Sequence, residues 1–167
     1  MYRKLKALSL AVLIAAAVLF LDQWTKHIVM DYFDRALLSK ELYLTSWFNI
    51  CLVYNRGVSF GFLQNMHVEG SLALALLAIV AAVAFLVWVV CNPQATVSLS
   101  AGLIAGGAVG NAVDRLSIGA VVDFIDWHVF EYHWPAFNIA DTSICIGVAV
   151  VFLHTLIHNK CQSKTIL

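Results

Sequence analysis

Charged residues are scarce in this sequence. Asp, Glu, Lys and Arg together make up 12% of its 167 residues, whereas soluble domains carry about 25%. Hydrophobic residues account for 62% of the chain, and the mean hydropathy is +0.86. The shortage of charge excludes a soluble globular domain of this length and indicates an integral membrane protein. The length favours one domain over residues 1–167.

Cysteine is also sparse, and the positions of the four cysteines exclude two kinds of site. Only Cys51 is expected in an outer loop, so the sequence predicts no disulfide framework. The cysteine spacings match no zinc-binding pattern. His128 and His133 lie in a loop at a spacing that differs from the helical HExxH zinc motif. We therefore expect neither a metal site nor a cofactor.

Acidic residues are absent from both ends of the chain. All ten lie between Asp22 and Asp141, whereas residues 1–21 and 142–167 carry only basic charges. The basic cluster near the start favours cytoplasmic termini, although Lys and Arg are otherwise evenly divided. A cleavable signal peptide is the alternative for the first apolar run. That run lacks a small-x-small cleavage pattern, which favours an uncleaved span.

Four apolar stretches are long enough to cross a membrane. The predicted spans cover residues 5–26, 71–91, 97–115 and 139–158. In the third, Gly102, Gly106 and Gly110 recur every four residues, which lets a neighbouring helix approach closely. An even number of spans places both termini on the same side of the membrane.

The outer connections carry most of the polar sequence. Residues 31–40 are predicted to form a short interfacial helix. Residues 41–55 are rich in aromatic and apolar residues and predict short strands. The aromatic residues of this first connection suit a membrane–water boundary, and they are Trp47, Phe48, Tyr54, Phe60 and Phe62. The second connection covers residues 117–138 and contains Trp127, Tyr132, Trp134 and Pro135. The expected fold class is an all-α membrane protein with four transmembrane helices, a small β-rich cradle and an interfacial helix.

Two aspartates, Asp123 and Asp141, are flanked by residues that belong in or next to hydrocarbon. A buried carboxylate there costs several kcal/mol, so such residues are usually functional. Asn138 could cap the last helix with Asp141 in its first turn, which is a structural alternative. That alternative does not explain the second acid. We therefore expect Asp123 and Asp141 to form one site.

Further polar residues are expected near these two acids. Asp22 and Lys26 are spaced i, i+4, which fits either an interfacial ion pair or a supporting role in the site. Asp114 and Arg115 are expected to pair with each other at the end of the third span. Asp126 is expected to be solvated in the loop. The acids and amides that gather at the outer span ends are Asp22, Asn55, Asn111, Asp114, Asn138 and Asp141.

Paired carboxylates suit peptide hydrolysis, because two close acids cannot both ionise. The ionised acid can activate water while the protonated one donates to the carbonyl oxygen. The competing hypothesis is a small proton-coupled membrane transporter. It predicts acids near the bilayer midplane and repeated helices, and the sequence shows neither.

The chain resembles the lipoprotein signal peptidase family, also called signal peptidase II, through five motifs in order. These are Asp22-Gln-Trp-Thr-Lys26, Asn55-Arg-Gly-Val-Ser-Phe60, Gly106-Gly-Ala-Val-Gly-Asn111-Ala-Val-Asp114-Arg115, Val122-Asp123-Phe124 and Phe137-Asn138-Ile-Ala-Asp141. Val58 and Ser59 depart from the Asn-x-Gly-Ala-Ala-Phe form that is frequent in the family.

The resemblance implies a bacterial inner-membrane aspartic endopeptidase with its site near the periplasmic face. It would remove signal peptides from diacylglyceryl-modified prolipoproteins, on the amino side of the lipid-bearing cysteine. Asp123 and Asp141 would be catalytic. The supporting or substrate-binding residues would be Asp22, Lys26, Asn55, Gly57, Asn111, Asp114, Arg115 and Asn138. The implied partners are the precursor, membrane lipid and a globomycin-type inhibitor, with no nucleic acid, and the chain would act as a monomer.

Overall fold

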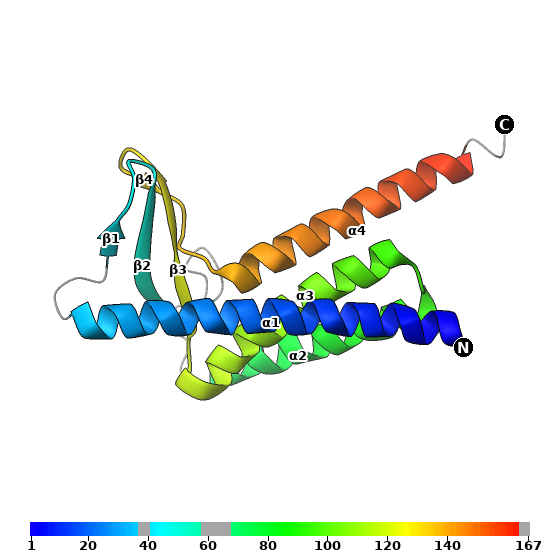
Figure 1. Cartoon of the computed structure of the whole chain (residues 1–167), viewed down its shortest axis with the longest axis horizontal. Helices are drawn as coiled ribbons and strands as arrows, with labels where there is room; N and C mark the ends of the chain where they lie inside the picture. Colours follow the sequence, from blue (N-terminus) through cyan, green and yellow to red (C-terminus); the bar gives the residue numbers. More distant parts are fainter. Residues whose placement is uncertain (37–40, 58–67, 164–167) are drawn as a thin grey trace.

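The protein is a bundle of four long helices with a small antiparallel sheet at one end, as seen in a computed structural model (Figure 1). The structure describes residues 1–36, 41–57 and 68–163. The helices are α1 (Tyr2–Ala36), α2 (Val68–Cys91), α3 (Ala95–Ile118) and α4 (Ile139–Ser163). All four are long and apolar enough to cross a membrane. Each of the four predicted spans lies within one of them.

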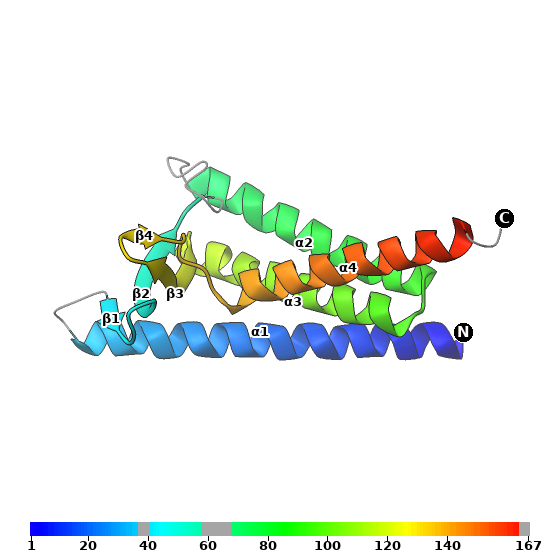
Figure 2. The same ribbon diagram turned by 90° about the horizontal axis from the view of Figure 1, so that it is seen from above.

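Helix α3 lies at the centre of the bundle. It packs against α1, α2 and α4, and α1 and α2 flank it (Figure 2). In the most apolar 18-residue stretch of α3, 72% of the residues are buried, whereas the corresponding stretches of the other three helices are 17–22% buried. The expected glycine face explains this. Gly102 and Gly106 meet α1 so closely that a Cβ on either would lie 2.7 Å from an α1 carbonyl oxygen. The predicted close helix contact is confirmed.

Helix α1 is longer than its predicted span. Residues 2–36 contain neither glycine nor proline, so nothing in the sequence interrupts the helix. Its 35 residues extend about 52 Å at the α-helical rise, well beyond the hydrocarbon thickness. The interfacial helix expected over residues 31–40 is not separate in its described part, because residues 31–36 continue α1. Residues 37–40 lie outside the described part of the chain.

The sheet has the strand order β1-β2-β3-β4, and every neighbouring pair is antiparallel. The strands are β1 (Glu41–Tyr43), β2 (Phe48–Asn55), β3 (Val121–Val129) and β4 (Tyr132–His133). The strands predicted within residues 41–55 are confirmed. Strand β3, which comes directly after α3, was not predicted from the sequence. Phe33 of α1, Leu52 and Val122 form a small core that joins the sheet to the first helix.

Candidate active site

The structure brings Asp123 and Asp141 to one cavity of about 290 Å³ between the sheet and the helix ends. Asp123 lies on β3 and is 2% exposed, and Asp141 lies in the first turn of α4. We call this space the carboxylate cavity. Its lining residues are Asn55, Asn111, Arg115, Val121, Asp123, Asp141, Ile144 and Cys145. Val121, Ile144 and Cys145 were not expected at the site, because isolated apolar residues carry no sequence signal for it.

Asn138 contacts both carboxylates. Its side-chain nitrogen donates to Asp123 Oδ1 at 2.8 Å, and its backbone N–H donates to Asp141 Oδ2 at 3.3 Å. The Asn138 side-chain oxygen accepts the backbone N–H of Asp141 at 2.9 Å, which is a capping-box arrangement. Asn138 therefore caps α4, as the structural alternative expected. The same asparagine that caps α4 also reaches across to Asp123.

Asp123 accepts hydrogen bonds from two amides, one on each side. Besides Asn138, the Asn55 side-chain nitrogen donates to Asp123 Oδ2 at 3.0 Å. The pKa of Asp123 is raised to about 7, first by burial and then by the nearby negative charge of Asp141, while the Asn55 bond acts in the opposite direction. A carboxyl with this pKa holds a proton for part of the time at neutral pH.

Asn111 holds Asp141 from the α3 side. Its nitrogen donates to Asp141 Oδ1 at 2.8 Å. Its oxygen accepts from Lys26 Nζ at 3.1 Å and from Asn138 Nδ2 at 3.2 Å. Because two donors already occupy the oxygen, the nitrogen of the amide must face the carboxylate. Lys26 thereby orients a group that contacts Asp141, although Lys26 does not itself line the cavity.

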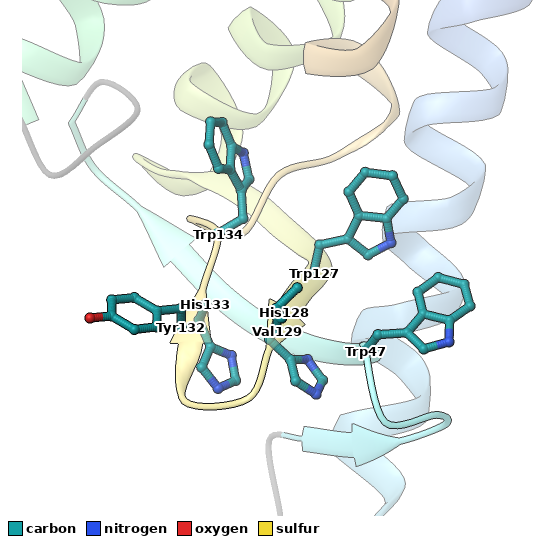
Figure 3. Close-up of a pocket in the computed structure, with 7 residues that line it drawn as sticks. All are labelled: Trp47, Trp127, His128, Val129, Tyr132, His133 and Trp134. Atoms are coloured by element: carbon teal, nitrogen blue, oxygen red, sulfur yellow. The ribbon is translucent and has the colours of Figure 1, made fainter.

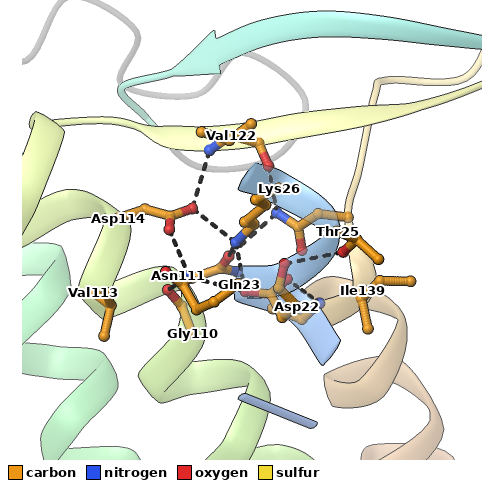
Figure 4. A network of polar contacts seen from close by, with 12 residues as sticks. Asp22, Gln23, Thr25, Lys26, Gly110, Asn111, Val113, Asp114, Val122 and Ile139 are labelled. Atoms are coloured by element: carbon orange, nitrogen blue, oxygen red, sulfur yellow. Dashed lines mark hydrogen bonds and ion pairs between the residues drawn. The ribbon is translucent and has the colours of Figure 1, made fainter. Parts of the chain in front are cut away.

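Lys26 lies between two buried aspartates beneath the site (Figure 4). Its ammonium is 2.7 Å from both Asp22 and Asp114 carboxylate oxygens, and the three side chains are 0–6% exposed. Asp22 also accepts the backbone N–H of Ala140 at 2.9 Å, and Asp114 accepts that of Val122 at 3.1 Å. This cluster therefore joins α1 and α3 to the strand and the helix that carry the two cavity aspartates.

The expected Asp114–Arg115 pair is wrong. Asp114 forms its ion pair with Lys26 and accepts a further hydrogen bond from Gln23 at 2.8 Å. Consecutive residues on a helix point in different directions, so Arg115 turns toward the carboxylate cavity instead. Its guanidinium donates to the backbone oxygen of Gly57 at 3.0 Å. Gln23 was missed because a glutamine beside Asp22 carries no charge pattern of its own.

Gly57 helps to place Asn55. The Gly57 backbone N–H donates to Asn55 Oδ1 at 3.0 Å, so the amide nitrogen of Asn55 is directed to Asp123. The bond from Arg115 to Gly57 ties this turn to α3. The neighbouring Val58 and Ser59, which differ from the frequent family form, lie outside the described residues.

The expectation that Asp126 is solvated is wrong. Asp126 lies on β3, is 9% exposed and accepts a hydrogen bond from Asn49 at 3.2 Å. It also lies 2.9 Å from His133 Nδ1. On a strand, side chains alternate between the two faces, so Asp126 and Asp123 point to opposite faces of β3. Asp126 therefore does not belong to the carboxylate cavity.

Fold and site together define a multi-pass membrane protein whose two cavity carboxylates lie where the sheet meets the helices. Residues 14–157 match the family described as signal peptidase (SPase) II. The chain is 37% identical over 160 residues to the lipoprotein signal peptidase of Francisella tularensis subsp. mediasiatica, covering 94% of this chain and 95% of the relative. It is 39% identical over 149 residues to that of Oleidesulfovibrio alaskensis, covering 88% and 94%.

Two solved structures share the fold of this chain. A bacterial membrane enzyme determined by the in meso method at 2.3 Å resolution aligns with a TM-score of 0.71 and 30% identity, over 87% of each chain. A second such enzyme, at 1.9 Å resolution, aligns with a TM-score of 0.70 and 31% identity, over 87% of this chain and 92% of its own. This chain belongs to the signal peptidase II family, and it is a protease.

Proposed function

We propose that this protease removes the signal peptide of diacylglyceryl-modified prolipoproteins, with Asp123 and Asp141 as the catalytic pair. It hydrolyses the peptide bond on the amino side of the lipid-bearing cysteine. The observation that carries the proposal is that both carboxylates line one cavity and both contact Asn138. The family relatives are lipoprotein signal peptidases.

The two carboxylates take different roles in the proposed reaction. Asp141 lies at the N-terminus of α4, where backbone N–H groups favour a negative charge, so it is the base that deprotonates water. Asp123, whose pKa is raised to about 7 by burial and by the charge of Asp141, is the acid that donates to the carbonyl oxygen. Asn55 and Asn138 position Asp123, and Asn111 positions Asp141.

The acids lie at one end of the helices, which favours hydrolysis at the membrane surface over transport. Asp123 is on a strand, and Asp141 is in the first turn of α4. A proton-coupled transporter would place its acids near the bilayer midplane. A lipid-modified cysteine is held at the membrane surface by its acyl chains, so its scissile bond comes within reach of a site at the helix ends.

We infer an orientation with cytoplasmic termini and the carboxylate cavity near the periplasmic face of the bacterial inner membrane. The start of α1 and the described end of α4 lie at the end of the bundle opposite the sheet (Figure 1). The basic cluster Arg3, Lys4 and Lys6 lies at that end.

Residues 1–167 act as a single domain and as a monomer in this proposal, because β2, α3, β3 and α4 of one chain supply all the described residues that line the cavity. A globomycin-type inhibitor would occupy the same cavity and compete with the precursor.

The direct test is cleavage by the purified full-length chain. A diacylglyceryl-modified prolipoprotein and the same precursor without lipid are incubated with it, and mass spectrometry locates the cleaved bond. We expect cleavage of the lipidated precursor alone, on the amino side of its modified cysteine. Equal cleavage of both precursors, or a cut elsewhere, would contradict the proposed substrate.

The pH dependence tests the role of Asp123. The protonated form of Asp123 is lost as pH rises through about 7, because its pKa is raised to about that value. We therefore expect kcat/KM to fall about tenfold per pH unit well above neutrality. The Asn55 bond stabilises the charged carboxylate, so Asn55→Ala should move this decline to higher pH. A decline that stays in place in Asn55→Ala would argue against Asp123 as the acid.

A further inference from the structure

A second cluster of polar side chains lies at the far end of the sheet. We call Asp126, His128 and His133 the hairpin cluster. His128 and His133 are directly opposite each other in the β3–β4 hairpin. Asp126 is two residues before His128 on the same strand, so all three side chains share one face. The two imidazole rings stack with their centroids 4.8 Å apart (Figure 3).

The separations within the hairpin cluster fit metal ligation. One potential ligand atom from each of the three residues lies within 4.8 Å of the others. His133 Nδ1 is 2.9 Å from Asp126 Oδ1, and His128 Nδ1 is 3.6 Å from Asp126 Oδ2. Ligands about 2.1 Å from a tetrahedral zinc ion are separated by about 3.4 Å. The His133–Asp126 distance of 2.9 Å is slightly shorter than this separation, and the His128–Asp126 distance of 3.6 Å is slightly longer.

An unsatisfied nitrogen points to a ligand at this place. His128 Nδ1 is buried and has no hydrogen-bond partner among the described residues, although the Asp126 carboxylate is its neighbour. A buried imidazole nitrogen without a partner is costly unless it binds something. The carboxylate itself is held from behind, because Asn49, 2% exposed, donates to Asp126 Oδ2 at 3.2 Å. Such a bond orients a ligating carboxylate in metal sites.

We propose that Asp126, His128 and His133 bind one zinc ion, with the fourth position open to water. Two imidazoles and a carboxylate are ligands that Zn²⁺ prefers. The His133 side chain is 54% exposed, which leaves a path for the ion to enter. The site lies on the opposite face of β3 from Asp123, so it is separate from the carboxylate cavity. Its ion would link β3 to β4 and brace the aromatic hairpin that carries Trp127 and Tyr132.

This proposal departs from the expectation of no metal site. The spacing of His128 and His133 does not fit a helix, but it places the two residues opposite each other across a tight hairpin. The HExxH motif places its two histidines on a helix, so it does not describe two histidines paired across a hairpin. Asp126 was expected in solvent and therefore not as a ligand.

Zinc binding to the purified full-length chain, free of any polyhistidine tag, tests the site. The protein is stripped with a chelator and dialysed against Zn²⁺, and bound zinc is then counted by mass spectrometry and titrated against a competing indicator. We expect one ion per chain, and a melting temperature that rises with Zn²⁺. His133→Ala, a replacement at a half-exposed position, should weaken binding at least about tenfold and abolish that rise. His128→Ala should do the same.

The matched control is His27→Ala, which removes a histidine on α1 outside the hairpin cluster. It should bind zinc like the unmodified chain. The proposal is overturned if the unmodified chain binds well below one ion, if His133→Ala and His128→Ala both bind as tightly as the unmodified chain, or if His27→Ala loses binding equally.

Discussion

Replacing Asp123 or Asp141 by Asn is expected to abolish cleavage of a lipidated precursor. Asn has nearly the same shape as Asp but can neither donate the acid proton nor act as the base. Loss of a general acid or base lowers rates by about 100- to 10,000-fold, and each variant removes the cooperation between the two groups as well. The rate should be measured with precursor in excess, so that weaker binding does not mimic slower chemistry.

The two variants must be folded, so that a loss of cleavage reports on the chemistry and not on unfolding. Both should elute as the unmodified chain does in detergent and melt at a similar or higher temperature, since a buried carboxylate is replaced by a neutral amide. Asp31→Asn, at an exposed position on α1, is the matched control and should retain full activity. Asp126→Asn should also cleave at a comparable rate, because Asp126 faces away from the cavity. A fully folded Asp141→Asn that cleaves normally would remove the proposed pair.

Replacing Lys26 by Met is expected to have the largest effect on stability. The change leaves Asp22 and Asp114 buried without their shared cation. Removing one partner of a buried ion pair costs about 3–5 kcal/mol, and two carboxylates lose their partner here. The Asn111 amide also loses the donor that orients it toward Asp141. We therefore expect a much lower melting temperature and, in whatever folds, slower cleavage.

Arg35→Met is the matched control for this change. Arg35 and Asp31 form the same i, i+4 geometry on the same helix, but their side chains are 82% and 71% exposed. Surface pairs of this kind contribute about 0–1 kcal/mol, so this variant should be close to the unmodified chain. Adding Asp22→Asn to Lys26→Met should restore part of the stability, because one uncompensated charge is removed. Equal losses from Lys26→Met and Arg35→Met would contradict the buried role of Lys26.

The helices were predictable because hydropathy is a local property of the chain. Each predicted span falls within an observed helix, and the glycine spacing on α3 correctly indicated a close helix contact. The end of α1 was misjudged, because the predicted span ends at Lys26 and a separate helix was expected over residues 31–40. Continuous helix-forming sequence and contacts with the sheet, such as that of Phe33, extend it to Ala36.

Residue types at the site were predictable, whereas their pairings were not. Asp114 had a basic neighbour at Arg115, but its partner is Lys26 from another helix. Asp126 was misjudged because β3 was not recognised, so the alternation that buries its side chain could not be applied. In both cases the nearest residue in sequence was less informative than the direction in which the side chain points.

The sequence by itself determined four apolar helices, an excess of acids and amides at one end of them, and two aspartates that hydrocarbon would not tolerate without a function. Only the tertiary structure decided that Lys26 serves both Asp22 and Asp114, that Asn138 contacts both cavity carboxylates, and that two histidines of a hairpin share one face with Asp126. The physical reason is range. Hydropathy acts over one helix, but the contacts from Lys26 to Asn111 and from Asp22 to Ala140 join residues 85 and 118 positions apart, and only packing brings these together.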